Sequence, residues 1–349
     1  MTANPHDLTA RLRSFHKQHG LPGIAAAVVT ADSVLMAATG TRVRGGSDPV
    51  GEADTWHIGS CGKSMTAALW ARLVQRGQAT WEDTVSELFC DLDPKPHPAW
   101  QTVTITDLLS HFAGLAGNLT QADLKAAYSK EESPADQRTE VAARALAAPP
   151  VRYGRFLYSN LGYTIAGAAI ERVTGEPFDS AMGREILHPL GMSSAGFGPP
   201  SGDQPWGHRP RWVMLGRGEA IAPNEMSLPH PADNPPVMTP AGRLHVSLAD
   251  WARFVRLFLT DGPDFLTAES VGLLTTSPPG RKSSQGLGWA IPAGGSPPIA
   301  HAQQGSNMRW IATALVHRDR HHAVLIVCND GRQRLLRACA RLGLALVAT

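Results

Sequence analysis

The sequence is poor in cysteine and in long apolar runs, and each scarcity excludes a class of protein. Its 349 residues contain four cysteines without C-x-x-C spacing, which excludes a disulfide-dense scaffold and indicates a reducing compartment or indifference to redox state. No run approaches the roughly 20 apolar residues of a transmembrane helix. Residues 1–20 are polar and mixed in charge, without the apolar core of a signal peptide. We therefore expect no membrane span and a cytoplasmic protein, unless a leader has been removed.

An excess of charge of one sign is also absent. The 32 basic and 30 acidic residues leave a net charge of +2, and no basic stripe has aromatic residues interleaved with it. Such a balance does not favour nucleic acid as a partner. The length is sufficient for one large domain or two intermeshed domains with an ample core.

The most informative stretch is Ser60-Cys61-Gly62-Lys63, which places a hydroxyl and an amine three residues apart. On a helix these two side chains share one face, so a nucleophile would lie beside its possible base. The apolar spacing of residues 64–74 predicts a helix with Ser60 at or near its start. The unpaired amides and the positive end of the helix dipole would favour an alkoxide at Ser60 and disfavour a charged Lys63.

Three other interpretations of this stretch are weaker. Residues 62–64 end like a phosphate-binding loop, but His57 stands where that loop needs its first glycine. Ile58 stands where a G-x-S-x-G nucleophile elbow needs a glycine. Cys61 as a nucleophile would need an imidazole partner, for which His57 is the nearest candidate. We expect Cys61 to be a small packing residue.

A second motif is Tyr158-Ser159-Asn160, which lies at a predicted turn before an apolar helix that runs to Val173. A phenol and a carboxamide two residues apart on such a turn can both point into a cleft. The alternative is that Tyr158 packs in the core and Asn160 caps the helix.

A third motif lies within residues 298–307, before two strand-like runs. In an extended chain His301, Gln303 and Gly305 fall on one face. Gly305 would let a substrate approach the backbone closely, and the amide of Ser306 would serve as an oxyanion donor. The alternative is an ordinary strand end and turn.

In this order and at these separations, the three motifs resemble those of the penicillin-recognising serine hydrolases. This family includes class C β-lactamases, serine DD-peptidases, esterases and D-aminopeptidases. Further segments carry the likeness along nearly the whole chain: Ile105 to Leu115, similar to the family's "I-T-x-x-x-L-L-x-H-x-x-G-L", His188 to Met192, Pro240 to Leu244, Ala249 to Phe254, and Gly286 to Trp289.

The resemblance implies a role for each motif residue. Ser60 would be acylated, Lys63 would shuttle its proton, and Tyr158 would share the base role. Asn160 would hold the amide or carbonyl of the substrate beside Lys63. The backbone amides of Ser60 and Ser306 would form the oxyanion hole.

The third motif departs from the family pattern, which is Lys-x-Gly, or His-x-Gly followed by Ser-Asn. If Gly305 keeps the family position, Gln303 stands where a cation or imidazole is expected and His301 is displaced along the strand. If His301 keeps it, Gln303 stands where glycine is expected and narrows the cleft. Either register weakens recognition of a substrate carboxylate. A class A deacylating glutamate motif is also absent, so Tyr158 and Lys63 would have to activate water as well.

We therefore predict a serine hydrolase that acts through an acyl-serine intermediate on small esters, amides or D-amino-acid peptides, with weak or no β-lactamase activity. We expect no cofactor and no metal. The alternative is a catalytically impaired relative that binds or senses such molecules. The presence of Ser60, Lys63, Tyr158 and Asn160 together favours the enzyme.

The pattern along the chain predicts an α/β (α+β) fold of the β-lactamase and transpeptidase type. Strand-like runs at residues 24–30, 34–39, 310–316 and 323–328 predict an antiparallel β-sheet. Helical patterns at residues 7–19 and 332–347 predict that terminal helices flank this sheet. We expect residues 1–59 and 242–349 to form the sheet domain, and residues 60–241 to form an inserted, mostly helical domain.

Two further segments are interpreted from their composition. Residues 199–240 are rich in proline, and we expect a cleft loop in which Trp206 and Trp212 shape an acyl pocket; the alternative is an excursion on the solvent side. His317, His321 and His322 flank a predicted hairpin turn and are expected to splay apart, so no metal site is expected there.

Overall fold

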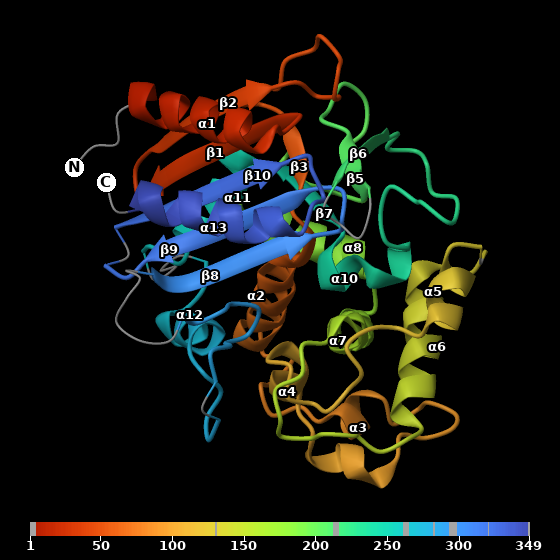
Figure 1. The fold of residues 1–349 in the computed structure, drawn as a ribbon. Helices are drawn as coiled ribbons and strands as arrows, with labels where there is room; N and C mark the ends of the chain where they lie inside the picture. Colours follow the sequence, from red (N-terminus) through yellow and green to blue (C-terminus); the bar gives the residue numbers. More distant parts are fainter. Residues whose placement is uncertain are drawn as a thin grey trace.

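A five-stranded antiparallel sheet forms the centre of the molecule in the computed structural model, which describes residues 5–129, 131–211, 216–260, 265–281, 283–292, 299–319 and 321–347 (Figure 1). The strand order is β2-β1-β10-β9-β8, and every neighbouring pair is antiparallel. The strands are β1 (Gly23–Thr30), β2 (Val34–Gly40), β8 (Ile299–Ser306), β9 (Ile311–His317) and β10 (His322–Cys328). The predicted sheet is confirmed, and it joins both ends of the chain.

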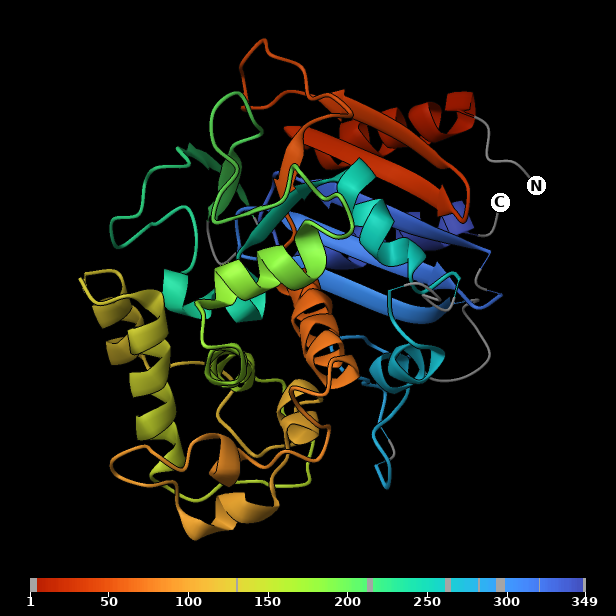
Figure 2. The ribbon, with the colours of Figure 1, turned by 180° about the vertical axis from the view of Figure 1, so that it is seen from behind.

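Helices cover both faces of this sheet. The helices α1 (Pro5–His19) and α13 (Arg334–Val347) pack on one face, and α11 (Leu248–Arg256) packs against β1 on the other (Figures 1 and 2). The continuous apolar runs of β1 and β10 follow from this arrangement, because a central strand covered on both sides buries every side chain. The predicted terminal helices are confirmed within about two residues at each end.

The middle of the chain is mostly helical, with α2 (Gly62–Gln75) at its centre (Figure 2). The helix α2 is apolar on nearly all sides and is buried accordingly. The remaining helices are α3 (Val85–Leu88), α4 (Ile105–Leu109), α5 (Gln121–Ala127), α6 (Pro134–Leu146), α7 (Asn160–Thr174), α8 (Phe178–Met182), α10 (Thr239–Gly242) and α12 (Ala268–Thr275). The division into domains at residues 59/60 and 241/242 stays a prediction.

Two small sheets accompany the central one. In the first, β7 (Leu244–Ser247) pairs with β3 (Thr55–His57) and β4 (Gly196–Phe197); in the second, β5 (Gly207–Arg211) pairs with β6 (Gly216–Ile221). The hairpin of β5 and β6 corrects the expectation of a loop over residues 199–240. The proline-rich composition hid it, since β5 and β6 contain few of the β-branched and aromatic residues that mark strands. Trp212 lies outside the described residues.

The hairpin between β9 and β10 corrects a second expectation. His317 and His322 do not splay apart: their rings stack with centroids 4.6 Å apart. Nδ1 of His317 lies 2.5 Å from Oδ1 of Asp319, and Nε2 of His322 lies 3.1 Å from the carbonyl oxygen of Val347. These three side chains bring possible ligand atoms within 4.8 Å of one another. None of the helices in the described part of the chain has the length and apolar character needed to span a bilayer.

A fully buried histidine, His208, ties the hairpin of β5 and β6 to the central sheet. Its Nδ1 donates to the carbonyl oxygen of Asn329 at 2.6 Å, and its Nε2 accepts from the amide of Arg44 at 3.0 Å. An imidazole with one donating and one accepting nitrogen is neutral. Burial lowers the pKa of His208 from the usual 6.5 to about 4, although the bond to Asn329 opposes this shift.

This burial makes stability depend on pH. Between pH 6.5 and about 4 the unfolded chain binds a proton at His208 that the folded chain does not, so stability is lost as the pH falls. We expect His208 to contribute a slope of up to about 1.4 kcal/mol per pH unit to the free energy of unfolding. Urea unfolding of wild type and His208→Gln between pH 4 and 7 measures this slope, with exposed His188→Gln as the control. Equal slopes in wild type and His208→Gln would contradict the assignment.

Candidate active site

Ser60 lies on a 3₁₀ turn (Gly59–Cys61) that leads directly into α2, and the edge of β8 runs alongside it. The contact is so close that a Cβ atom added to Gly305 would lie 1.9 Å from the carbonyl oxygen of Ile58 and 2.8 Å from the amide nitrogen of Ser60. Only glycine fits there, which explains the glycine of the third motif. The prediction that Ser60 lies near a helix start is confirmed.

Lys63 follows one turn later and is 2 % exposed. Its Nζ lies 3.1 Å from Oγ of Ser60 and 2.8 Å from Oδ1 of Asn160, and it also donates to the carbonyl oxygen of Ala241. The side chain of Lys63 is therefore held among three neutral oxygen atoms. The sequence interval of three residues brings the amine beside the hydroxyl as predicted.

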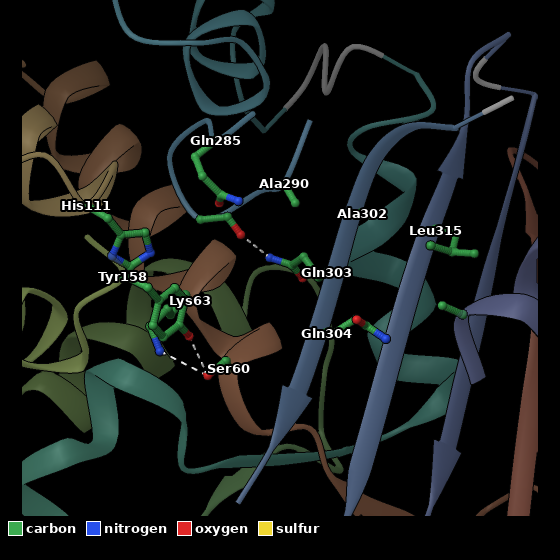
Figure 3. A pocket seen from close by; sticks show the side chains of 12 residues that line it. Ser60, Lys63, His111, Tyr158, Gln285, Ala290, Ala302, Gln303, Gln304 and Leu315 are labelled. Carbon is green, nitrogen blue, oxygen red and sulfur yellow. Dashed lines mark hydrogen bonds between the residues drawn. The ribbon is translucent and has the colours of Figure 1, made fainter. Parts of the chain in front are cut away.

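Tyr158 reaches Ser60 beside Lys63, whose Nζ lies 5.0 Å from the centroid of the Tyr158 ring. Its hydroxyl donates to Oγ of Ser60 at 2.8 Å (Figure 3). The side chain of Ser159, and not that of Asn160, caps α7 by accepting from the amide of Gly162 at 2.8 Å. The alternative of a core Tyr158 and a capping Asn160 is therefore wrong, since both side chains converge on Ser60 and Lys63.

His111 is a site residue whose role is not predicted by the sequence motifs. It has a positive φ of 68°, and its ring stacks on Tyr158 with centroids 4.5 Å apart. Nδ1 of His111 accepts from the amide of Ser159 at 3.0 Å. Burial lowers the pKa of His111 to about 3, so the imidazole is neutral near neutral pH. Its signal in the sequence was the histidine of the Ile105–Leu115 segment, whose spacing does not reveal a contact with Tyr158.

Gln303 occupies the position on β8 that faces α2. The packing of Gly305 against Ser60 agrees with the register in which Gly305 keeps the family position; that Gln303 stands where the family carries a cation or imidazole stays a prediction. The side chain of Gln303 is 5 % exposed: its Oε1 accepts from Oγ of Ser64 at 3.2 Å, and its Nε2 donates to the carbonyl oxygen of Gly288 at 2.5 Å. Both ends of the amide are thus committed within the protein.

His301 lies two residues before Gln303, next to an irregularity in the β8–β9 register between Ile299 and His301. Its ring meets that of Trp289 edge-on, with centroids 6.2 Å apart. His301 is not among the residues that line the cavity beside Ser60. The structure therefore places Gln303, and not His301, next to the proposed nucleophile's helix.

The backbone of β8 directs the amide of Ser306 toward Ser60. Ala302 exchanges both of its backbone hydrogen bonds with Ala290 on the outer edge of β8, at 2.9 Å each. Residues at even intervals along an antiparallel strand direct their backbone groups to the same edge. Ser306 therefore points its N–H to this edge, where a Cβ added to Gly59 would lie 2.5 Å from the Ser306 nitrogen.

Cys61 is fully buried, and burial raises the pKa of its thiol. Its expected role as a packing residue agrees with this environment. His57, the imidazole considered as its partner, uses both ring nitrogens elsewhere: Nδ1 accepts from the amide of Gly59, and Nε2 contacts Asp233.

A cavity of about 270 Å³ opens beside Ser60 (Figure 3). None of the described residues that line it is an arginine or an acid, and none of those in 199–240 contributes to its wall. The lining residues are Ser60, Lys63, His111, Tyr158, Gln285, Gly288, Ala290, Ala302, Gln303, Gln304, Leu315 and Ala340. The site therefore combines one amine with a largely uncharged pocket.

Comparison with known proteins agrees with this geometry. A family model described as Beta-lactamase matches residues 8–347. The chain belongs to the β-lactamase family. The predicted resemblance is confirmed, and the protein is an enzyme of the β-lactamase-like serine hydrolases.

Individual relatives of this β-lactamase family member are distant. Penicillin-binding protein 4 of Amycolatopsis lactamdurans is 28 % identical over 293 residues, which cover 80 % of this chain and 74 % of the relative. Esterase EstB of Burkholderia gladioli is 27 % identical over 192 residues, covering 52 % and 48 %. The solved D-amino acid amidase from Ochrobactrum anthropi SV3 superposes with a TM-score of 0.77 at 20 % identity and covers 99 % of this chain and 98 % of its own, which is a likeness of fold.

Proposed function

We propose that the protein hydrolyses small esters, amides or D-amino-acid peptides through an acyl intermediate on Ser60. The observation that carries this proposal is that Oγ of Ser60 lies 3.1 Å from Nζ of Lys63 and 2.8 Å from the hydroxyl of Tyr158. A nucleophile with two adjacent groups able to move its proton is the arrangement that acyl transfer needs. Relatives named as an esterase and as a penicillin-binding protein support the same reaction class.

Lys63 contacts three oxygen atoms, of which that of Ser60 alone also carries a proton to give. The oxygens of Asn160 and Ala241 can only accept, so a neutral amine donates its two protons to them and directs its lone pair at Ser60. Lys63 then takes the Ser60 proton as Oγ bonds to the substrate carbonyl carbon. The carbonyl oxygen becomes an oxyanion, which the amides of Ser60 and Ser306 bind.

The second half of the cycle reverses these transfers. Collapse of the tetrahedral intermediate breaks the bond to the leaving alcohol or amine, which takes a proton from Lys63 through Tyr158. A water molecule then attacks the acyl carbon while Tyr158 and Lys63 accept its proton, and Oγ of Ser60 leaves with a proton as the acid departs. Tyr158 suits the contact with leaving group and water, because it is 41 % exposed while Lys63 is buried.

The lining of the cavity favours substrates without a free carboxylate next to the scissile bond. Two residues before Gly305 on β8, the side chain of Gln303 carries no charge, and its amide is hydrogen-bonded to Ser64 and Gly288. Among the described residues that line the cavity, Lys63 is the one cation, and its contacts are used within the catalytic group. Neutral esters and amides therefore suit this site better than β-lactams, whose carboxylate would find no cationic partner but Lys63 among these described residues.

The acyl-enzyme is tested by intact mass spectrometry and ester turnover. Wild type incubated with a fluorophosphonate should gain one adduct, and Ser60→Ala should gain none. Ser60→Ala should also lose at least about 10³-fold in kcat for p-nitrophenyl acetate, because the nucleophile is removed. An adduct without turnover in wild type would favour the alternative of a binder or sensor. Turnover that survives in Ser60→Ala would contradict the proposal.

The substrate class is tested by paired substrates that differ in one carboxyl group. We expect wild type to hydrolyse a neutral methyl-capped ester at least about tenfold faster, in kcat/KM, than the same compound with a free carboxylate, since a charge-assisted bond of ordinary strength is absent. Gln303→Lys should narrow this ratio, whereas Gln75→Lys, which adds the same charge at the far end of α2, should not. Equal rates on both substrates in wild type would contradict this assignment.

A further inference from the structure

A buried carboxylate behind the Ser60 turn joins the two segments that supply the proposed oxyanion amides. The side chain of Asp233 has no exposure. Its Oδ2 lies 3.0 Å from Nε2 of His57, and its Oδ1 accepts from Nδ2 of Asn307 at 2.9 Å. His57 stands three residues before Ser60, and Asn307 directly follows Ser306. The side chain of Asp233 thus contacts both arms of the site, by which we mean the segment that leads to Ser60 and the segment that follows Ser306.

The hydrogen bonds of His57 fix where its proton lies. The amide of Gly59 donates to Nδ1 at 3.1 Å, so Nδ1 carries a lone pair. Nε2 therefore carries the proton and donates it to Asp233. This sets the position of the Gly59 amide, one residue before Ser60. Gly59 itself has a φ of 53°, a conformation that glycine adopts without strain.

The amide of Asn307 is fixed in the same way on the other arm. Its Oδ1 accepts from the amides of Arg309 and Trp310 at 3.0 and 3.1 Å. Its Nδ2 is thereby directed at Asp233. The turn that follows β8 includes Met308 at a φ of 67°, which is strained for a residue other than glycine. The bond to Asp233 holds this turn, and with it the end of β8 at Ser306.

A third contact extends the cluster toward Lys63. Nε of Arg243 lies 3.3 Å from Oδ2 of Asp233, and the preceding segment supplies Ala241, whose carbonyl oxygen accepts from Lys63. Burial opposes ionisation of Asp233, but His57, Arg243 and Asn307 outweigh it and hold the pKa of this carboxyl below its usual range. Asp233 is therefore an ionised hub in contact with His57, Asn307 and Arg243, which lie on three of the segments around Ser60.

We propose that Asp233 is a positioning residue for the oxyanion hole: through His57 and Asn307 it fixes the distance between the amides of Ser60 and Ser306. The proposal rests on the function proposed above. An oxyanion hole acts only when its donors lie about 2.7–3.1 Å from the developing charge, so small shifts of either arm lower the rate. Asp233 does not touch the substrate and acts through its two neighbours.

The test compares p-nitrophenyl acetate with its thiono analogue, in which sulfur replaces the carbonyl oxygen. Sulfur is larger and accepts hydrogen bonds weakly, so the rate ratio of the two substrates reports on the oxyanion hole. Asp233→Asn places an NH₂ group against the donors of His57 and Arg243 at unchanged size. We expect kcat for the oxygen ester to fall about 10- to 100-fold with little change in KM, and the thiono substrate to lose much less. His57→Leu, which removes both imidazole bonds, should lower the ratio in the same way.

The control is Glu185→Gln, another change of a fully buried carboxylate to an amide. Glu185 pairs with Arg76 beyond the far end of α2, about 21 Å along the helix from Ser60. Rates are normalised to the fraction of protein that a fluorophosphonate labels. A variant that is partly unfolded therefore does not give a falsely low kcat. A ratio that falls in Asp233→Asn and not in Glu185→Gln supports the proposal. Equal losses on both substrates would overturn it, and turnover in Ser60→Ala would instead overturn the proposed function and this inference with it.

Discussion

The contact between the edge of β8 and the turn at Ser60 is the constraint on which the site depends. Main chain meets main chain there, and a single methyl group at Gly305 would overlap the carbonyl oxygen of Ile58. The contact brings together a helix start from the N-terminal part of the chain and a strand from its C-terminal part. This contact places the backbone amides of Ser60 and Ser306 near each other at the edge of β8. Because the contact is between backbone atoms, a change of side-chain conformation cannot produce it.

The polar groups around this contact are arranged by their donor and acceptor capacity. Lys63 is surrounded by three neutral oxygens, those of Ser60, Asn160 and Ala241. His111 is neutral because burial lowers its pKa to about 3, so it supports Tyr158 without adding charge. A buried negative charge lies at Asp233, behind the turn and bonded to His57 and Asn307. The proposed proton transfer at Ser60 thus uses Lys63 and Tyr158, whereas Asp233 supports the backbone.

Much of the fold could be predicted from the sequence because its signals are local. The strands at both ends of the chain have continuous apolar runs, and the terminal helices have an apolar stripe, so their types and approximate bounds follow from periodicity. The interval from Ser60 to Lys63 equals about one helical turn, which predicts their contact. The hairpin of β5 and β6 was missed because its residues, among them Arg209 and Pro210, lack any strand pattern.

The contacts between distant segments could not be predicted in the same way. Gln303 was recognised as unusual, but its bonds to Ser64 and Gly288 depend on how β8 meets α2. The roles of His111 and Asp233 have no local signature, since each is defined by a partner far away in the sequence. Periodicity indicates which face of a helix or strand is buried, but it does not identify the polar group of another segment that this face contacts.

The most direct test of the account is a crystal structure of the protein after reaction with a fluorophosphonate. The account predicts phosphorus bonded to Oγ of Ser60, with the phosphoryl oxygen within hydrogen-bond distance of the backbone nitrogens of both Ser60 and Ser306. Phosphorus on another residue, or a phosphoryl oxygen that contacts neither amide, would contradict it.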